Sequence, residues 1–337
     1  MRYLLIATLI GTGIITNAQL PSIELINAGN SNHFRGISAP TKNVVWVSGT
    51  KGTIGRSIDG GKNWQWMQVK GFEKTDFRDI EAFNKKTAVI MGIDNPAVIL
   101  KTTDGGLHWK TVYRNDTQGM FLDALAFYPC NKKYGTVVGD PINGKFFLAT
   151  TRNKGKSWTE LSYEARPSAD YGEGCFAASG TNILMTAKFK FLFISGGLQS
   201  KLYFLNKGEQ IPILQGNQNS GANSVSQYTY KRVNHTIITG GDYSRDTITE
   251  KNCIYSEDNG KTWLSPIIEP KGYRSAIMHI KRNELITCGT SGVDYSIDGG
   301  KNWTYLSKLS FHCIAVAKKG KAVYLAGAKG QLAKLKF

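Results

Sequence analysis

The sequence contains few of the residues from which disulfide frameworks, metal sites and membrane spans are built. Its 337 residues include 5 cysteines without a Cys-x-x-Cys pair and 5 histidines without metal-ligand spacing. The odd number of cysteines leaves at least one thiol without an intramolecular partner, and argues against a disulfide framework or a zinc site. No segment beyond the N-terminus approaches the roughly 18 apolar residues of a membrane span. We therefore expect no cofactor, no metal site, no transmembrane segment and mostly buried, free cysteines.

Acidic residues are also scarce. The chain has 25 Asp and Glu against 42 Lys and Arg, a formal net charge of +17. Such an excess either keeps a lysine-rich surface soluble or attracts anionic partners, such as an acidic glycan or an acidic protein segment. We expect no nucleic-acid partner, and a monomer.

The first residues have the pattern of a secretory signal peptide. Arg2 supplies a positive start, Leu4 to Ile15 is an apolar run, and Thr16-Asn17-Ala18 offers small residues for cleavage before Gln19. Residues 1–18 are therefore expected to be a signal peptide. Residues 19–337 are expected to form a single exported domain, periplasmic or extracellular.

An eight-residue motif, Ser/Thr-x-Asp/Asn-x-Gly-x-x-Trp, occurs five times. The copies are Ser57–Trp64, Thr102–Trp109, Thr151–Trp158, Ser256–Trp263 and Ser296–Trp303. Five copies with the same offsets indicate an array of structural repeats. The motif has the chemistry of a tight turn: a short side chain accepts turn N–H groups, glycine tolerates positive φ, and the indole packs over the turn. The residues expected to accept these bonds are Asp59, Asp104, Asn153, Asp258 and Asp298.

This motif resembles the Asp-box, or bacterial neuraminidase repeat. The resemblance implies a β-propeller with each box between the third and fourth strands of a blade, on the rim away from the binding face. It also places this chain near the sialidase superfamily. The box residues are thereby assigned a structural role.

The spacing of the boxes predicts seven blades. The interval from Trp158 to Trp263 is about twice the others, so one blade between them has lost its box. Its strands are expected at 191–197, 200–206 and 210–214, with a degenerate turn at 206–208. After the last box, strands at 311–317, 322–327 and 331–337 leave one blade a strand short. Residues 23–26 are expected to complete that blade and close the ring. The fold class is therefore an all-β, seven-bladed β-propeller.

Within this class the chain resembles the exported propellers of the photosystem II stability and assembly factor family. Besides the boxes, the resemblance depends on four segments that look like blade-starting strands: Phe34-Arg35-Gly36-Ile37, Val45-Trp46-Val47-Ser48-Gly49, Asp76-Phe77-Arg78-Asp79-Ile80 and Phe176-Ala177-Ala178-Ser179-Gly180. It implies an arginine-rich patch on one face.

Aligning the first strands of the repeats reveals a basic column opposite the boxes. The aligned pairs are Phe34-Arg35, Phe77-Arg78, Phe121-Leu122, Tyr273-Arg274 and Phe311-His312. Arg35, Arg78, Arg274 and His312 are therefore candidate ligand-binding residues, because arginine suits carboxylate and phosphate recognition. Alternatively, nearby acids such as Asp79 and Asp123 pair with these arginines in a structural network.

A long loop, residues 241–252, is the candidate specificity loop on the same face. It contributes Asp242 and Arg245 to the predicted site. Its acids, Asp242, Asp246 and Glu250, raise the alternative of calcium binding, although the spacing of an EF-hand is absent.

Two functional hypotheses follow from these observations. The first is a non-enzymatic scaffold or assembly-factor-like propeller that binds an anionic ligand or acidic protein segment on its arginine-lined face. The second is a sialidase-like glycosidase acting on acidic sugars, because residues 34–37 partly match the Phe/Tyr-Arg-Ile-Pro signature of that family. No tyrosine–glutamate pair is assigned, so the catalytic residues stay unknown, and seven blades depart from the six of sialidases.

Overall fold

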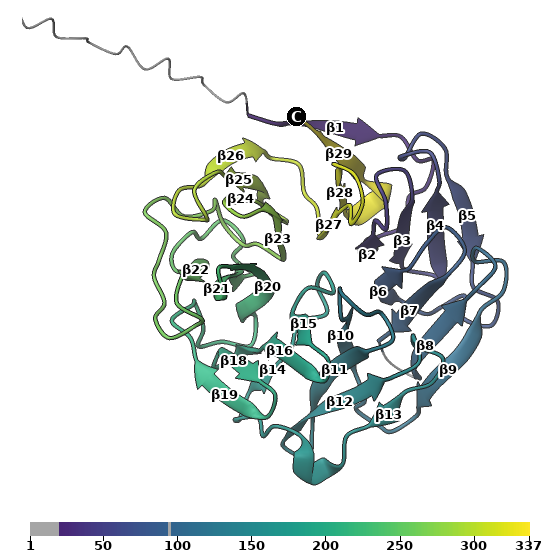
Figure 1. Ribbon diagram of the computed structural model, residues 1–337, viewed down its shortest axis with the longest axis horizontal. Coiled ribbons are helices and arrows are strands. Elements are labelled where there is room, and N and C mark those ends of the chain that lie inside the picture. Colours follow the sequence, from purple (N-terminus) through teal and green to yellow (C-terminus); the bar gives the residue numbers. More distant parts are fainter. Residues whose placement is uncertain (1–19, 94–95) are drawn as a thin grey trace, which may run out of the picture.

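The structure is a computed structural model that describes residues 20–93 and 96–337. Within this part of the chain, seven antiparallel sheets surround a common centre, which confirms the predicted seven-bladed propeller (Figure 1). The same residues contain no α-helix, only the short 3₁₀ turns η1 (Tyr163–Ala165) and η2 (Ala328–Gly330). No described helix is long and apolar enough to cross a membrane. The predicted signal peptide, residues 1–18, lies outside the described residues.

The first three blades follow the box spacing directly. Blade 1 contains β2 (Phe34–Ser38), β3 (Val45–Gly49), β4 (Thr53–Ser57) and β5 (Gln65–Gln68). Blade 2 contains β6 (Phe77–Ala82), β7 (Ala88–Gly92), β8 (Ala97–Thr102) and β9 (Lys110–Asn115). Blade 3 contains β10 (Leu122–Phe127), β11 (Gly135–Ile142), β12 (Lys145–Thr151) and β13 (Thr159–Glu160).

Blades 4 to 6 complete most of the ring. Blade 4 contains β15 (Ile183–Ala187), β16 (Lys190–Ile194), β18 (Lys201–Phe204) and β19 (Lys207–Gln210). Blade 5 contains β20 (Ser220–Tyr230), β21 (Val233–Asp242) and β22 (Cys253–Ser256), and its sheet is extended by β14 (Glu173–Gly174) and β17 (Gly196–Gly197). Blade 6 contains β23 (Ala276–Lys281), β24 (Glu284–Gly289), β25 (Gly292–Ser296) and β26 (Thr304–Ser307).

Blade 7 is built from both ends of the chain. It contains β27 (Cys313–Val316), β28 (Val323–Ala326) and β29 (Leu332–Lys336), and β1 (Ser22–Ile26) pairs antiparallel with β29. The register runs from Ser22 opposite Lys336 to Ile26 opposite Leu332. The predicted closure of the ring is confirmed. It removes the exposed sheet edge that an open ring would leave.

Blade 4 exists as predicted, and the strands predicted at 191–197 and 200–206 overlap β16 and β18. The first strand, β15, was not predicted, and the last strand is β19 rather than 210–214. The turn predicted at 206–208 lies at Leu205-Asn206, because Phe204 pairs with Lys207. Without a box there is no fixed marker for the third and fourth strands, and Leu205 takes positive φ where the other blades use glycine.

Each box is a turn held by its own side chains, as predicted. In the first copy the Asp59 carboxylate accepts the backbone N–H groups of Lys62 and Asn63 at 3.1 and 3.0 Å. The Ser57 hydroxyl accepts the N–H of Gly61 at 2.9 Å. Hydrogen bonds from Asn63 lower the pKa of Asp59 to about 2. These bonds are local, so the boxes hold turns and leave no acceptor directed at a ligand.

The indole of each box packs between its own blade and the preceding one. Trp109 of blade 2, for example, joins the apolar cluster of Trp46 in blade 1, and their rings meet edge to face at 6.5 Å. Indoles occupy the other box-bearing junctions in the same way: Trp64, Trp158, Trp263 and Trp303. Aromatic burial at blade junctions therefore supplies much of the core. All five cysteines are free, and only Cys130 is exposed.

Candidate ligand-binding site

The first strands of four blades each carry one extra residue where they enter the ring. The pairing of β2 with β3 passes from Phe34 to Gly36 and skips Arg35, and the pairing of β6 with β7 skips Arg78 in the same way. Asp123 in β10 and Asn223 in β20 occupy the same bulge position. Bulges of this kind redirect a side chain.

At the centre of the ring, three of these positions, Arg35, Arg78 and Asn223, line a cavity of about 400 Å³, which we call the mouth. Its polar lining comes from blades 1, 2, 3, 5, 6 and 7 and includes Arg35, Arg78, Asp140, Asn223, Ser275, Thr290 and His312. Arg35, Arg78 and His312 are thus brought together as the sequence predicted. Asn223, Ser275 and the aromatic residues Phe176, Tyr243 and Tyr273 also line the mouth and were missed.

The floor of the mouth is a segment that crosses the ring, residues 175–182, here called the plug segment. Its Ser179 hydroxyl donates to the carbonyl of Ser275 in blade 6 at 2.7 Å. Its Thr181 carbonyl accepts the N–H of Val225 in blade 5 at 2.9 Å. Arg78 of blade 2 lies 3.5 Å from the Ala177 carbonyl. The plug segment therefore contacts three blades and closes the centre beneath the arginines.

The interpretation of residues 176–180 as a blade-starting strand was wrong. The N–H of Ala178 bonds to the carbonyl of Phe176 at 2.7 Å, and Gly180 has φ of 70°, which no strand adopts. The Gly180 backbone passes against the Asp79 carboxylate, where a Cβ would meet Asp79 at 2.4 Å. Glycine is required there because the segment leaves the sheet and crosses the centre.

Arg35 is the distinctive group of the mouth. Its side chain is half-buried and makes no hydrogen bond or ion pair with any described residue. Burial, and then the positive charge of Arg78, lower the pKa of Arg35. Arg78 itself is paired with Asp76 at 2.9 Å. The mouth therefore holds a largely desolvated guanidinium that no carboxylate bonds, since Asp76 bonds Arg78 and acts on Arg35 only through its charge. An anion in the mouth would stabilise this arrangement.

Two other acids near the mouth do not bond Arg35 either. Asp123 is fully buried, neither carboxylate oxygen has a partner among the described residues, and burial raises its pKa well above the usual range. Burial also raises the pKa of Asp140, which accepts the N–H of Cys175 at 2.9 Å. The predicted alternative, in which nearby acids pair with the arginines, holds in part: Arg78 pairs with Asp76 and Arg274 with Asp294, whereas Asp79 and Asp123 pair with none of them.

Aromatic side chains line the mouth together with the arginines. The Tyr273 hydroxyl donates to the Asn223 side chain at 2.8 Å, and the Tyr273 and Tyr243 rings meet edge to face at 6.3 Å. His312 is buried beside Arg35, and burial together with that positive charge lowers its pKa to about 3. A ligand in the mouth would therefore contact both cationic and aromatic side chains.

Arg274 does not reach the mouth, and its prediction there was wrong. Its N–H donates to the carbonyl of Gly240, as the N–H of Phe34 donates to Gly327 and that of Phe311 to Gly289. Arg274 is therefore equivalent to Phe34, one position before Arg35. Because a shift of one residue turns a strand side chain to the other side, Arg274 is fully buried within blade 6. There it pairs with Asp294 and donates to the carbonyls of Tyr273 and Lys271, both at 2.8 Å.

Three further predicted residues make contacts that hold the fold and do not line the mouth. Asp79 is buried and accepts the N–H groups of Ile80 and Leu125, each at 2.7 Å, which ties blade 2 to blade 3. In the long loop, Asp242 pairs with Arg245 at 2.9 Å. Among the described residues no group of three or more His, Cys, Asp or Glu side chains is placed to hold a metal ion. The loop reaches the mouth through Tyr243 instead.

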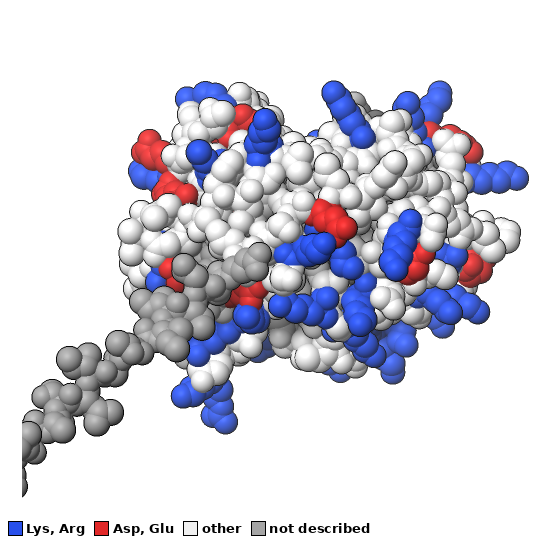
Figure 2. All heavy atoms as spheres, turned by 90° about the horizontal axis from the view of Figure 1, so that it is seen from above, with Lys and Arg blue, Asp and Glu red and all other residues white. Residues whose placement is uncertain are grey.

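The fold and the mouth together define a class: a seven-bladed propeller with box turns at its rim and a basic mouth at its centre. Figure 2 views the ring edge-on, and Lys and Arg outnumber Asp and Glu on the edge that faces the viewer.

Comparison with known proteins identifies a family profile and solved structures that this chain resembles. The family profile described as photosynthesis system II assembly factor YCF48 matches residues 24–120, which confirms the predicted resemblance there. No curated protein sequence matches the chain significantly.

Solved structures extend the likeness to the whole fold. A structure titled YCF48 bound to D1 peptide superposes with a TM-score of 0.65 at 17% identity, covering 95% of this chain and 98% of that one. YCF48 from Cyanidioschyzon merolae gives 0.61 at 17% identity, with 94% and 99% covered. The WD40 propeller domain of Doa1 gives 0.60 at 12% identity, with 94% and 97% covered. At these identities the likeness shows the fold alone.

Proposed function

We propose that this protein is an exported, non-enzymatic propeller that binds a carboxylate of an acidic protein segment in its mouth, as a scaffold or assembly factor. The observation that carries the proposal is Arg35, a half-buried guanidinium with no partner among the described residues. A carboxylate that entered the mouth would accept hydrogen bonds from Arg35 and supply the missing negative charge.

Two further observations support a peptide as the ligand. The mouth combines the cations Arg35 and Arg78 with the aromatic rings of Tyr243 and Tyr273, so it offers contacts to a charged group and to an apolar side chain at once. The similar propeller YCF48 has been solved with a D1 peptide bound. An acidic glycan is the other anionic ligand that the arginines suit. The signal-peptide pattern at residues 1–18 is the reason to place the protein outside the cytoplasm.

Calorimetric titration with a blocked Asp/Gly peptide tests the proposal, with the matching Asn/Gly peptide as the uncharged control. We expect Arg35→Ala with Arg78→Ala to weaken binding of the acidic peptide about tenfold or more. Arg245→Ala is the matched control, since Arg245 is exposed and lies outside the mouth. Unchanged affinity in the double variant would refute the mouth as the site. Tighter binding of an oligouronide than of the peptide would reassign the ligand to glycans.

The alternative, a glycosidase acting on acidic sugars, has one observation in its favour. Asp140 lines the mouth and burial raises its pKa, as a general acid requires. The two tyrosines of the mouth donate to Asn223 and Asn219, however, and not to a glutamate. Release of fluorophore from sialoside or uronide substrates, abolished by Asp140→Asn, would establish the glycosidase.

A further inference from the structure

The junction between blades 3 and 4 differs from the box-bearing junctions in what fills it. At five junctions the box of the following blade inserts an indole, as Trp109 does between blades 1 and 2. Blade 7 has no box, and the cluster between blades 6 and 7 contains no tryptophan either. Blade 4 has no box, and its equivalent turn is Leu205-Asn206. The apolar cluster at this junction contains Phe191 and Met185 but no tryptophan.

On the blade 3 side of this junction, strand β11 carries a smaller side chain than the equivalent strand of blade 1 does. By register, Thr136 opposite Thr150 in β11–β12 corresponds to Trp46 opposite Arg56 in β3–β4. Gly135 likewise corresponds to Val45. Thr136 therefore faces the place where the indole is missing, whereas a side chain at Gly135 would point to Phe127 at the junction with blade 2. The result is a cavity of about 390 Å³ between the blades, here called the junction cavity.

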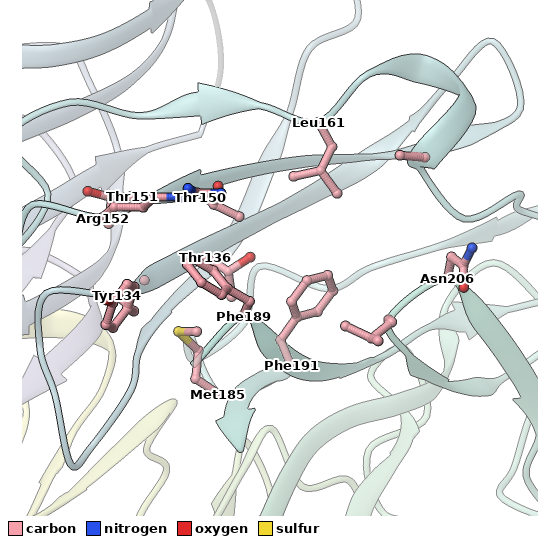
Figure 3. A pocket seen from close by; sticks show the side chains of 13 residues that line it. Tyr134, Thr136, Thr150, Thr151, Arg152, Leu161, Met185, Phe189, Phe191 and Asn206 are labelled. Carbon is pink, nitrogen blue, oxygen red and sulfur yellow. The ribbon is translucent and has the colours of Figure 1, made fainter. Parts of the chain in front are cut away.

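Figure 3 shows the rings of Phe189 and Phe191 and the thioether of Met185 around this cavity, with Leu161 on the opposite side. The described lining includes the cation Arg152 and no acidic residue. A volume of this size lies within the range of ordinary ligand sites, and its walls are aromatic and aliphatic. Its chemistry suits a flat apolar ring.

The lip of the junction cavity carries an aromatic residue in an unfavourable conformation. Phe189 is at the tip of the hairpin between β15 and β16, with φ of 61°, a region that bulky side chains rarely adopt. Hairpin tips between the first and second strands of other blades carry polar residues, such as Lys85-Lys86 and Lys231-Arg232. Local strain of this kind concentrates at ligand-binding positions.

Two cations flank the ring at the lip. The Arg152 guanidinium lies 4.5 Å from the centre of the Phe189 ring, and the Lys188 ammonium lies 5.1 Å from it. Lys188 is also 5.0 Å from the Tyr134 ring. Arg152 and Lys188 are exposed, so each remains open to a carboxylate that approaches the cavity.

We propose that the junction cavity binds an aromatic side chain, tryptophan above all, that is adjacent to an acidic residue in a peptide segment of a partner protein. The ring would take the place that box indoles fill at the box-bearing junctions, and the carboxylate would meet Arg152 and Lys188. This site lies between two blades and shares no lining residue with the mouth. It stands independently of the proposed function.

Two blocked peptides, Asp-Trp-Gly and Asp-Ala-Gly, test the site by saturation-transfer NMR and calorimetry. Because the mouth also offers aromatic contacts, only the part of the difference between the peptides that Thr136→Trp removes reports the junction cavity. We expect the tryptophan peptide to bind at least about tenfold more tightly. Equal binding of the two peptides would overturn the proposal.

Variants locate the binding and separate it from folding. Thr136→Trp restores the residue found at Trp46, fills the cavity and should abolish the preference for tryptophan. Phe189→Gly relieves the positive φ, so it should keep or raise the midpoint of thermal unfolding while it weakens tryptophan-peptide binding at least about fivefold. Arg152→Ala should weaken it less.

Ile297→Ala is the matched control, because Ile297 holds the position of Arg152 in the box of blade 6, whose indole is present. It should leave both affinities unchanged. Full tryptophan preference in a folded Phe189→Gly protein would place the binding elsewhere and refute the assignment.

Discussion

The propeller carries two rings of polar side chains, the boxes at its rim and the bulge residues at its mouth, and they differ in how they are satisfied. In the boxes each acceptor is bonded within its own turn, as Asp298 is to the N–H groups of Lys301 and Asn302. In the mouth, the Arg35 guanidinium has no partner among the described residues and stays partly open to a ligand. Repetition of a motif therefore marks structure here, and a partly exposed charge without a bonded partner marks the candidate site.

The largest expected effect comes from Arg274, which the sequence placed in the mouth and the structure places in the core. Arg274→Ala leaves the Asp294 carboxylate buried without its partner, so we expect a loss of about 3–5 kcal/mol in the free energy of unfolding. Denaturant titration measures it. Replacing both residues, Arg274→Met with Asp294→Leu, should recover most of the loss. A single variant as stable as the wild type would mean that Arg274 belongs with the mouth residues after all.

The next effect is a dependence of stability on pH that comes from His312. Its pKa is lowered to about 3 in the folded protein, whereas an unfolded histidine titrates near pH 6.5. The unfolded chain therefore takes up the proton first, and the contribution, complete above pH 6.5, is lost as the pH falls toward 3. Between pH 7 and pH 5 we expect a loss of about 2 kcal/mol.

Denaturant titrations of the wild type and His312→Gln at both pH values check this prediction. The His312→Gln variant should lose about 2 kcal/mol less stability than the wild type between pH 7 and pH 5. Parallel curves for the two proteins would show that folding does not lower the pKa of His312.

The smallest of these effects concerns the box ring. Asp298→Ala removes the acceptor for Lys301 and Asn302, which should cost about 1–2 kcal/mol of stability and leave peptide binding in the mouth unchanged. Asn302→Ala, which loses only the side-chain bond to Asp298, is the milder comparison. Calorimetric titration of both folded variants measures the affinity. A change in affinity without a change in stability would remove the distinction between the two rings.

Much of this architecture could be predicted from the sequence, because the boxes repeat and each fixes the third and fourth strands of its blade. They gave the number of blades, the blade without a box and the strand that closes the ring. The plug segment could not be predicted, because Phe176-Ala177-Ala178 has the composition of a buried strand. Only its contacts with blades 2, 5 and 6 show that it crosses the centre.

The alignment of the first-strand residues around the mouth could be predicted from the sequence only in part. Arg35, Arg78 and His312 were aligned correctly, but Phe121-Leu122 and Tyr273-Arg274 were each shifted by one residue because their aromatic residues were matched to Phe34. A better marker is the glycine near the end of each second strand, such as Gly49 and Gly289. A Cβ on Gly49 would lie 2.0 Å from the carbonyl oxygen of His33, and a Cβ on Gly289 would lie 2.0 Å from that of Tyr273. Tyr273 is therefore equivalent to His33 and not to Phe34.

Blade 7 joins the two ends of the described chain, and this has a consequence for the order of assembly. Six blades are complete before the final residues, 332–336, are available, whereas β1 has nothing to pair with until β29 is made. The ring therefore closes only in the step in which β1 and β29, from the two ends of the described chain, pair with each other. Any shape that the mouth presents to a ligand depends on that step, so the finished chain alone has the closed geometry.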